Sequence, residues 1–126
     1  MQFQIPSAFR RVLFPYQQAA VLLAARHVNQ RGGVLLGDVV GLGKTMMASA
    51  VASIFQEDMS WRTLILCPKN LVSMWEEYVY QYRLDAQVLS VTMAQQELPE
   101  LRRYNLVIVD ESQNLRNPEG KRWAVN

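Results

Sequence analysis

Several features are scarce in this chain, and each scarcity narrows its possible classes. Only one of the 126 residues is a cysteine, Cys67, so no disulfide framework can form and a reducing compartment fits. No apolar run approaches the ~20 residues that a membrane-spanning helix needs. No signal-peptide core follows Met1, because Pro6, Arg10 and Arg11 interrupt the start. We therefore expect a cytoplasmic protein with no membrane partner, and a bacterial nucleoid or a nucleus stays open as its location.

An excess of charge of one sign is missing too, since the net charge is only +2. This balance permits contact with nucleic acid without arguing for it, because binding domains usually carry a clustered basic stripe. Half of the residues are hydrophobic and 19% are charged, the ordinary balance of a folded globular domain. The length has room for one sizeable core. We expect residues 1–126 to form one domain.

Short apolar runs alternate with amphipathic stretches along the chain. Four apolar runs predict buried strands, at residues 34–36, 63–67, 86–91 and 106–109. Helices are predicted at 17–30 and 44–56, from a cap at Asn70 to about 82, and, short or broken, within 93–104. This alternation predicts an α/β fold, a parallel sheet with helices on both faces. Such sheets bind their ligands at the carboxyl ends of the strands.

The segment GDVVGLGKT, from Gly37 to Thr45, joins a predicted strand to a predicted helix. Gly41 and Gly43 let the backbone turn its N–H groups around a phosphate. Lys44 places a positive charge near the β- and γ-phosphates, and Thr45 offers a hydroxyl group to Mg²⁺. The positive end of the following helix adds to the attraction. The alternative is a plain glycine turn, which a second motif downstream disfavours.

That second motif is a pair of acids, Asp110 and Glu111, directly after the apolar run at 106–109. Asp110 can hold Mg²⁺ through its water shell, and Glu111 can orient and polarise the attacking water. The alternative is an exposed acidic turn. It fits poorly with four apolar residues that switch abruptly to two acids at the end of a parallel strand.

Four segments come in a fixed order: LFPYQQ, GDVVGLGKT, TLILCPKNLVSMW and LVIVDESQNLRNPEGKRW. Together they resemble the first RecA-like lobe of a superfamily-two helicase-like ATPase of the Swi/Snf type, the double-stranded DNA translocases and remodellers. The resemblance extends from about Leu13 to Trp123. It implies a three-layer P-loop NTPase fold, ATP and Mg²⁺ as cofactors, and duplex DNA as a partner of the whole protein.

The resemblance also implies a role for individual residues. Gln17 matches the glutamine that recognises adenine, just before the first helix. Lys44 and Thr45 match the ligands of the triphosphate and of Mg²⁺. Asp110 and Glu111 match the first two residues of a DEAH-type box. Asp110 and Thr45 are thus the expected Mg²⁺ ligands, and Glu111 and Lys44 the expected catalytic residues.

Other positions of the nucleotide site depart from the common patterns or complete them. Asp38 stands where the general loop pattern has glycine, but an acid here is common in the resembling family. Val39 stands where that family often has an acid, and we expect its side chain to point away from phosphate. Val40 and Leu42 complete the loop. Gln113 replaces the usual histidine of the box, and its amide group can still hydrogen-bond at the nucleotide.

The turn at Pro68, Lys69 and Asn70 resembles the motif that meets the DNA backbone. It puts a lysine and the N–H groups of a helix start where phosphates can sit. A plain turn from strand to helix explains Lys69 equally well, so both interpretations stay open.

Members of the resembling family continue into a second RecA-like lobe, whose arginines stabilise the transferred phosphoryl group. We therefore expect an incomplete lobe from a longer protein, which binds ATP or ADP with Mg²⁺ but hydrolyses ATP poorly without the missing second lobe. One alternative is a lobe of another superfamily-two RNA or DNA helicase or of a restriction-type translocase. The other is a non-catalytic module that docks on nucleic acid or protein.

Overall fold

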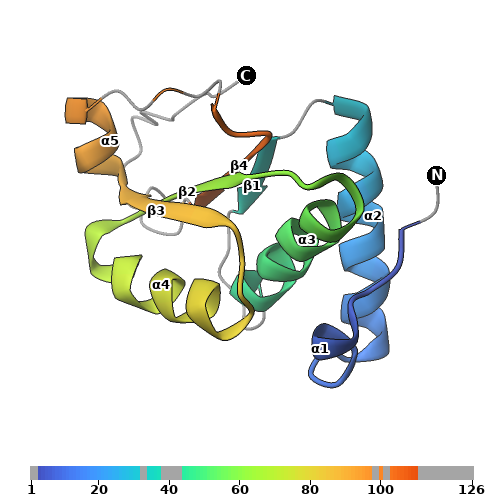
Figure 1. Ribbon diagram of the computed structural model, residues 1–126. Helices are drawn as coiled ribbons and strands as arrows, with labels where there is room; N and C mark the ends of the chain where they lie inside the picture. The colour runs from blue at the N-terminus through green and yellow to red at the C-terminus, as the bar shows by residue number, and fades with distance from the viewer. Residues whose placement is uncertain (1–2, 32–33, 38–43, 98–99, 101–102, 111–126) are drawn as a thin grey trace, which may run out of the picture.

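A parallel four-stranded sheet organises the computed structural model, which describes residues 3–31, 34–37, 44–97, 100 and 103–110. The strands are β1 (Val34–Gly37), β2 (Thr63–Cys67), β3 (Ala86–Ser90) and β4 (Leu106–Asp110). Their order is β1-β4-β2-β3, and each neighbouring pair is parallel. The predicted parallel α/β sheet is confirmed, and its last strand lies between the first two (Figure 1).

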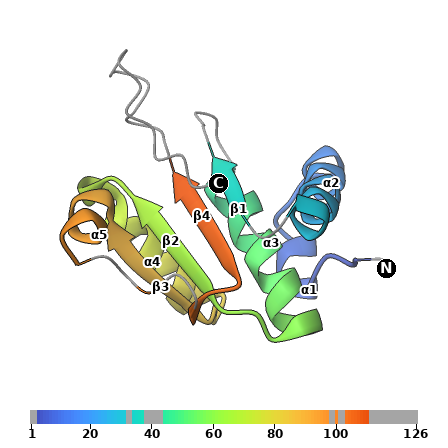
Figure 2. The same cartoon turned by 90° about the horizontal axis from the view of Figure 1, so that it is seen from above.

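Helices cover both faces of this sheet. They are α1 (Ser7–Arg10), α2 (Pro15–Arg31), α3 (Lys44–Met59), α4 (Val72–Gln81) and α5 (Val91–Glu97), with a 3₁₀ turn η1 (Lys69–Leu71) before α4. Side chains of α2, α3 and α4 pack into the larger cluster on one face, and α5 packs on the other. Figures 1 and 2 show α2 and α3 side by side, with α5 on the far side of the sheet from α3.

Successive residues of the inner strands bury opposite faces. Ile65 and Ile108 belong to the cluster under α2, α3 and α4, whereas Leu64 and Val107 belong to the cluster under α5. Side chains alternate across a strand, so a strand covered on both faces must be apolar at every position. This explains why β2 and β4 read as continuous apolar runs.

Two predicted helix starts were wrong. Asn70 does not cap α4, because it lies inside η1 and the residue before α4 is Leu71, which makes no side-chain capping bond. Pro68 is extended and its carbonyl accepts a hydrogen bond from the Leu71 N–H at 2.9 Å, so a tight 3₁₀ turn comes first. The helix predicted within 93–104 is α5, which begins at Val91 because the Ser90 hydroxyl oxygen caps it by accepting from the Met93 N–H at 3.0 Å.

Three further expectations relate to the whole chain. Among the described residues, no helix is both long enough and apolar enough to span a bilayer. That residues 1–126 form one domain, and that the protein is cytoplasmic, stay predictions.

Candidate nucleotide site

The parallel register brings the end of β1 and the first acid of the second motif together. Gly37 is the last residue of β1, and it pairs with Asp110, the last residue of β4. In Figure 2 the arrowheads of the two strands point to the same side of the molecule. The Asp110 side chain is half-buried. A carboxylate therefore lies beside the point at which β1 leads into the predicted phosphate loop.

The first turn of α3 carries the lysine and the threonine of the loop motif. Lys44 is the first residue of the helix and is exposed, and Thr45 follows it, half-buried. The Ser49 hydroxyl donates to the Thr45 carbonyl oxygen at 2.9 Å, within the helix. The first N–H groups of a helix have no partner inside it and attract anions. The predicted strand before the motif and the predicted helix after it are thus both present.

Eight of the predicted site residues lie outside the described residues: Asp38, Val39, Val40, Gly41, Leu42, Gly43, Glu111 and Gln113. Their assignments to the nucleotide site stay predictions.

Asp110 makes a contact that the sequence pattern did not predict. The Trp75 indole nitrogen, Nε1, donates to Asp110 Oδ2 at 3.1 Å, across 35 positions of sequence. Trp75 lies on α4 and is only 2% exposed. Asp110 makes at least one further interaction as well. A buried indole N–H usually needs a hydrogen-bond partner, and that need was the signal in the sequence that could have pointed to this contact.

Cys67 is the last residue of β2 and lies at the same edge, where nearby charge affects the pKa of its thiol. Burial, together with the smaller effects of the negative charges of Asp110 and then Glu76, raises the pKa of the Cys67 thiol from 9.0 to about 12. The thiol also contacts the Leu89 carbonyl oxygen at 4.0 Å. Cys67 therefore stays a neutral thiol at physiological pH, as expected for a core residue rather than a nucleophile.

Gln17 lies in the first turn of α2 and is 9% exposed. Its Oε1 accepts a hydrogen bond from the Phe14 N–H at 2.9 Å. A glutamine that reaches back in this way to the residue before a helix forms half of a capping box. The side-chain carbonyl of Gln17 thus holds the helix start, a structural role that the sequence pattern did not predict.

The turn predicted to meet DNA lies at the carboxyl end of β2. Lys69 and Asn70 are both exposed on η1. Since β2 pairs with β4, with Leu66 opposite Val109, this turn and Asp110 share one edge of the sheet. The structure therefore places the predicted nucleic-acid residues and the predicted metal ligand on the same side.

The donor groups at this edge suit Mg²⁺ that arrives with a nucleotide. Among the described residues, no cluster of three or more histidine, cysteine or acidic side chains could hold a metal ion by itself. Mg²⁺ in phosphate-transfer sites is usually held by one or two carboxylates together with the substrate phosphates and water. Asp110 and Thr45 fit that pattern.

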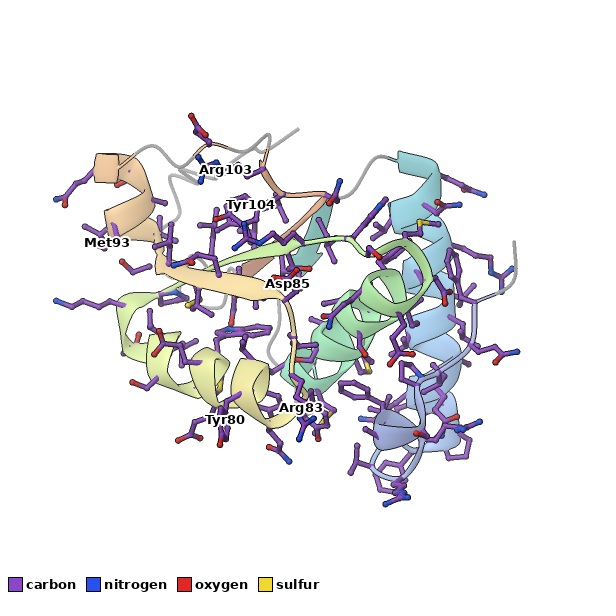
Figure 3. The ribbon with its side chains drawn as sticks, viewed as in Figure 1. Tyr80, Arg83, Asp85, Met93, Arg103 and Tyr104 are labelled. Atoms are coloured by element: carbon purple, nitrogen blue, oxygen red, sulfur yellow. The ribbon has the colours of Figure 1, made fainter. Side chains whose placement is uncertain are left out.

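The opposite edge, at the amino ends of the strands, is built differently. Arg62, just before β2, pairs with Asp85, just before β3, at 3.3 Å, and its guanidinium lies 5.5 Å from the centre of the Tyr104 ring. Figure 3 shows Asp85 and Tyr104 on this edge. The Asn105 side chain accepts a hydrogen bond from the Arg62 N–H at 3.1 Å.

The Gln56 side chain connects α3 to the segment before β3. It donates a hydrogen bond to the Arg83 carbonyl oxygen and accepts one from the Asp85 N–H.

A family model described as the SNF2-related domain matches residues 16–99. The chain belongs to this family. It is 31% identical over 91 residues to the DNA annealing helicase and endonuclease ZRANB3 of Mus musculus. This match covers 71% of this chain and 8% of that protein. It is 26% identical over 144 residues to a SWI/SNF-related matrix-associated actin-dependent regulator of chromatin subfamily A-like protein 1 homolog of Caenorhabditis elegans, covering 95% of this chain and 20% of that protein.

Among solved structures, the chain is similar to the Sulfolobus solfataricus SWI2/SNF2 ATPase core in complex with dsDNA. The TM-score is 0.63 at 23% identity, over 85% of this chain and 27% of that one. This likeness confirms a RecA-like fold, and the SNF2-related family match confirms the resemblance to the Swi/Snf-type helicase-like ATPase lobe. The chain spans a fifth or less of the length of these two curated relatives.

Proposed function

We propose that the chain is the ATP-binding lobe of a DNA-dependent Swi/Snf-type ATPase and translocase. The pairing of Gly37 with Asp110 carries the proposal, because it joins the start of the phosphate loop to an acid at the carboxyl edge of a parallel sheet. Membership of the SNF2-related domain family supports it.

In this proposal Lys44 and the first N–H groups of α3 bind the β- and γ-phosphates. Thr45 and Asp110 hold Mg²⁺, and Glu111 orients the attacking water. The metal, when bound, neutralises charge that develops on the phosphates. The backbone N–H groups of residues 38–43 are proposed to bind the phosphates.

Gln17 is proposed to recognise adenine through its NH₂ group, since its carbonyl oxygen already bonds to the Phe14 N–H. This division of the amide is compatible with both roles, because one end fixes the helix start and the other end reaches the base. Gln113 is proposed to hydrogen-bond near the nucleotide in place of histidine.

Duplex DNA is the proposed partner of the longer protein. The exposed Lys69 and Asn70 are proposed to contact its backbone, a role that suits their position on the sheet edge that carries Asp110. The Sulfolobus core, which has the same fold, is a complex with duplex DNA, and this supports the proposal. A second lobe is proposed to supply the arginines for efficient hydrolysis.

Calorimetry with ADP, with and without Mg²⁺, tests the proposal on the whole chain. We expect Mg²⁺-dependent binding that falls by roughly tenfold or more in Lys44→Ala, because a charge-assisted bond to phosphate is lost. Lys69→Ala is the matched control, since it removes the same charge from another turn and should leave the affinity for ADP unchanged. Absence of Mg²⁺-dependent binding in the wild-type chain would favour a docking module instead.

ATP turnover gives a second test. We expect the chain alone to hydrolyse ATP barely above background, with or without duplex DNA. DNA-stimulated turnover that disappears in Lys44→Ala would contradict the proposed need for a second lobe.

A further inference from the structure

We propose that Trp75 is a positioning residue for Asp110, whose carboxylate its indole N–H holds in the orientation that meets Mg²⁺. The inference rests on the proposed function, since it assigns Asp110 to the metal. It adds a residue on α4 to a site otherwise built from β4 and from the start of α3.

The geometry of the contact supports this role. The donor and acceptor atoms are 3.1 Å apart, and the donor side chain is 2% exposed. Ile65 and Cys67 of the sheet belong to the same buried cluster as Trp75, and the Tyr78 ring centre lies 6.3 Å from that of Trp75. A large ring packed in this way has little freedom to turn, so the direction of its N–H is fixed. Asp110 thereby has one oxygen tied to a rigid donor.

A fixed oxygen matters for a metal ligand. A carboxylate offers about four acceptor positions on its two oxygens, so a bond to Oδ2 leaves capacity to meet a metal or its water shell. The terminal torsion of an aspartate is broad, and a hydrogen bond to one oxygen narrows it. Partners of this kind orient metal ligands, and their loss typically weakens metal affinity or activity about 10- to 100-fold.

A purely structural tryptophan would behave differently. If Trp75 only fills the core, replacing it lowers stability and leaves the Mg²⁺ dependence of nucleotide binding unchanged in the folded chain. If it positions Asp110, the variant loses the gain in affinity that Mg²⁺ provides. The ratio of the ADP affinities with and without Mg²⁺ therefore separates the two roles.

The test compares Trp75→Phe with the wild-type chain by calorimetry. Phenylalanine keeps an aromatic ring in the core but has no N–H to donate. We expect the affinity for ADP with Mg²⁺ to fall about 10- to 100-fold, while the affinity for ADP alone stays unchanged. Trp61→Phe is the matched control, because Trp61 stacks on Phe55, with ring centres 4.4 Å apart, and should leave both affinities unchanged.

A spectroscopic measurement checks the hydrogen bond itself and does not need Trp75→Phe to fold stably. The chain has three tryptophans, so the indole N–H resonance of Trp75 in the wild-type chain is identified by elimination against Trp61→Phe and Trp123→Phe. It should move in Asp110→Asn and again when ADP with Mg²⁺ is added. The Trp61 resonance should stay in place in both experiments.

The outcomes separate this inference from the proposed function. A wild-type chain that binds no ADP with Mg²⁺ overturns both. If the wild-type chain binds and folded Trp75→Phe binds equally well in Mg²⁺, only the inference falls. A Trp75 resonance that does not respond to Asp110→Asn also overturns the inference and leaves the proposed function standing.

Discussion

The polar side chains at the two edges of the sheet differ in the contacts that they make. At the amino edge, Arg62 pairs with Asp85 and covers the Tyr104 ring, so charged and aromatic groups from three strand starts bind one another. At the carboxyl edge, Asp110 ends β4 and accepts a hydrogen bond from the buried Trp75, and Lys44 begins α3. The first arrangement joins strands, whereas the second lies where we propose that a nucleotide binds.

This difference follows from the parallel topology. All four strands start at one edge and end at the other, and each crossover helix delivers its first turn to the carboxyl edge. Helix starts and strand ends therefore meet where a phosphate can bind. Changes at the amino edge should affect stability alone, whereas changes to Lys44, Thr45 or Asp110 at the carboxyl edge should affect nucleotide binding.

The largest effect on stability is expected for Phe55→Ala, near the amino edge. Phe55 is fully buried, stacks on Trp61 and meets the Phe3 ring edge-on at 5.1 Å. Its truncation should lower the free energy of unfolding by about 3–5 kcal/mol, measured by urea denaturation. Phe55→Leu keeps more of the volume and should lose clearly less. A folded Phe55 variant with weakened Mg²⁺-dependent ADP binding would contradict the expectation that changes at the amino edge affect stability alone.

A smaller effect should appear at alkaline pH through Cys67. The folded thiol has a pKa of about 12, against 9.0 when it is unperturbed. The unfolded chain therefore loses this proton first, so the stability contributed by the neutral thiol is complete below pH 9 and is lost as pH rises toward 12. Between about pH 8 and about pH 10 we expect a loss on the order of 1 kcal/mol in urea denaturation. Cys67→Ala, the control, should lack this component.

The smallest effect is expected for Arg62→Ala. The ion pair with Asp85 is about half exposed on both sides, so water and salt screen it. Its loss should cost about 0.2–1 kcal/mol of unfolding free energy, and less at high salt. A double-mutant cycle with Asp85→Ala, run at low and at high salt, measures the coupling. A coupling that does not weaken with salt would show that this contact is more than a surface pair.

Much of the fold could be predicted because its signals are local. The run from Thr63 to Cys67 is a strand with the predicted bounds, since both faces of β2 are buried and proline follows. The strand predicted at 106–109 is β4, which extends one residue further to Asp110, and both of its faces are likewise buried. Errors came where short-range hydrogen bonds decided the chain path. Ser90 closes β3 and caps α5 at once, a combination that periodicity alone does not reveal.

The candidate site was predicted less completely. The strand end at Asp110 and the helix start at Lys44 follow from motif and periodicity. The bond between Trp75 and Asp110 does not, because it depends on how α4 is rotated against the sheet and on the register of β4. The role of the Gln17 side-chain carbonyl in capping α2 was not predicted either, because the same residue matched the adenine-recognition motif.

The position of β4 has a consequence for how the protein is made. Val34 pairs with Val107, its partner 73 positions later (107 − 34), and β4 also lies between β1 and β2. During synthesis β1 and β2 leave the ribosome before β4, which lies between them in the sheet. Neither strand can make these pairings until β4 has been synthesised. Pairing over such long sequence separations slows folding and leaves strand edges open to wrong partners. The pairing of β1 with β4, at the end of which we propose that phosphate binds, is therefore among the last in the sheet to form, and the nascent chain is most exposed to aggregation just before it does.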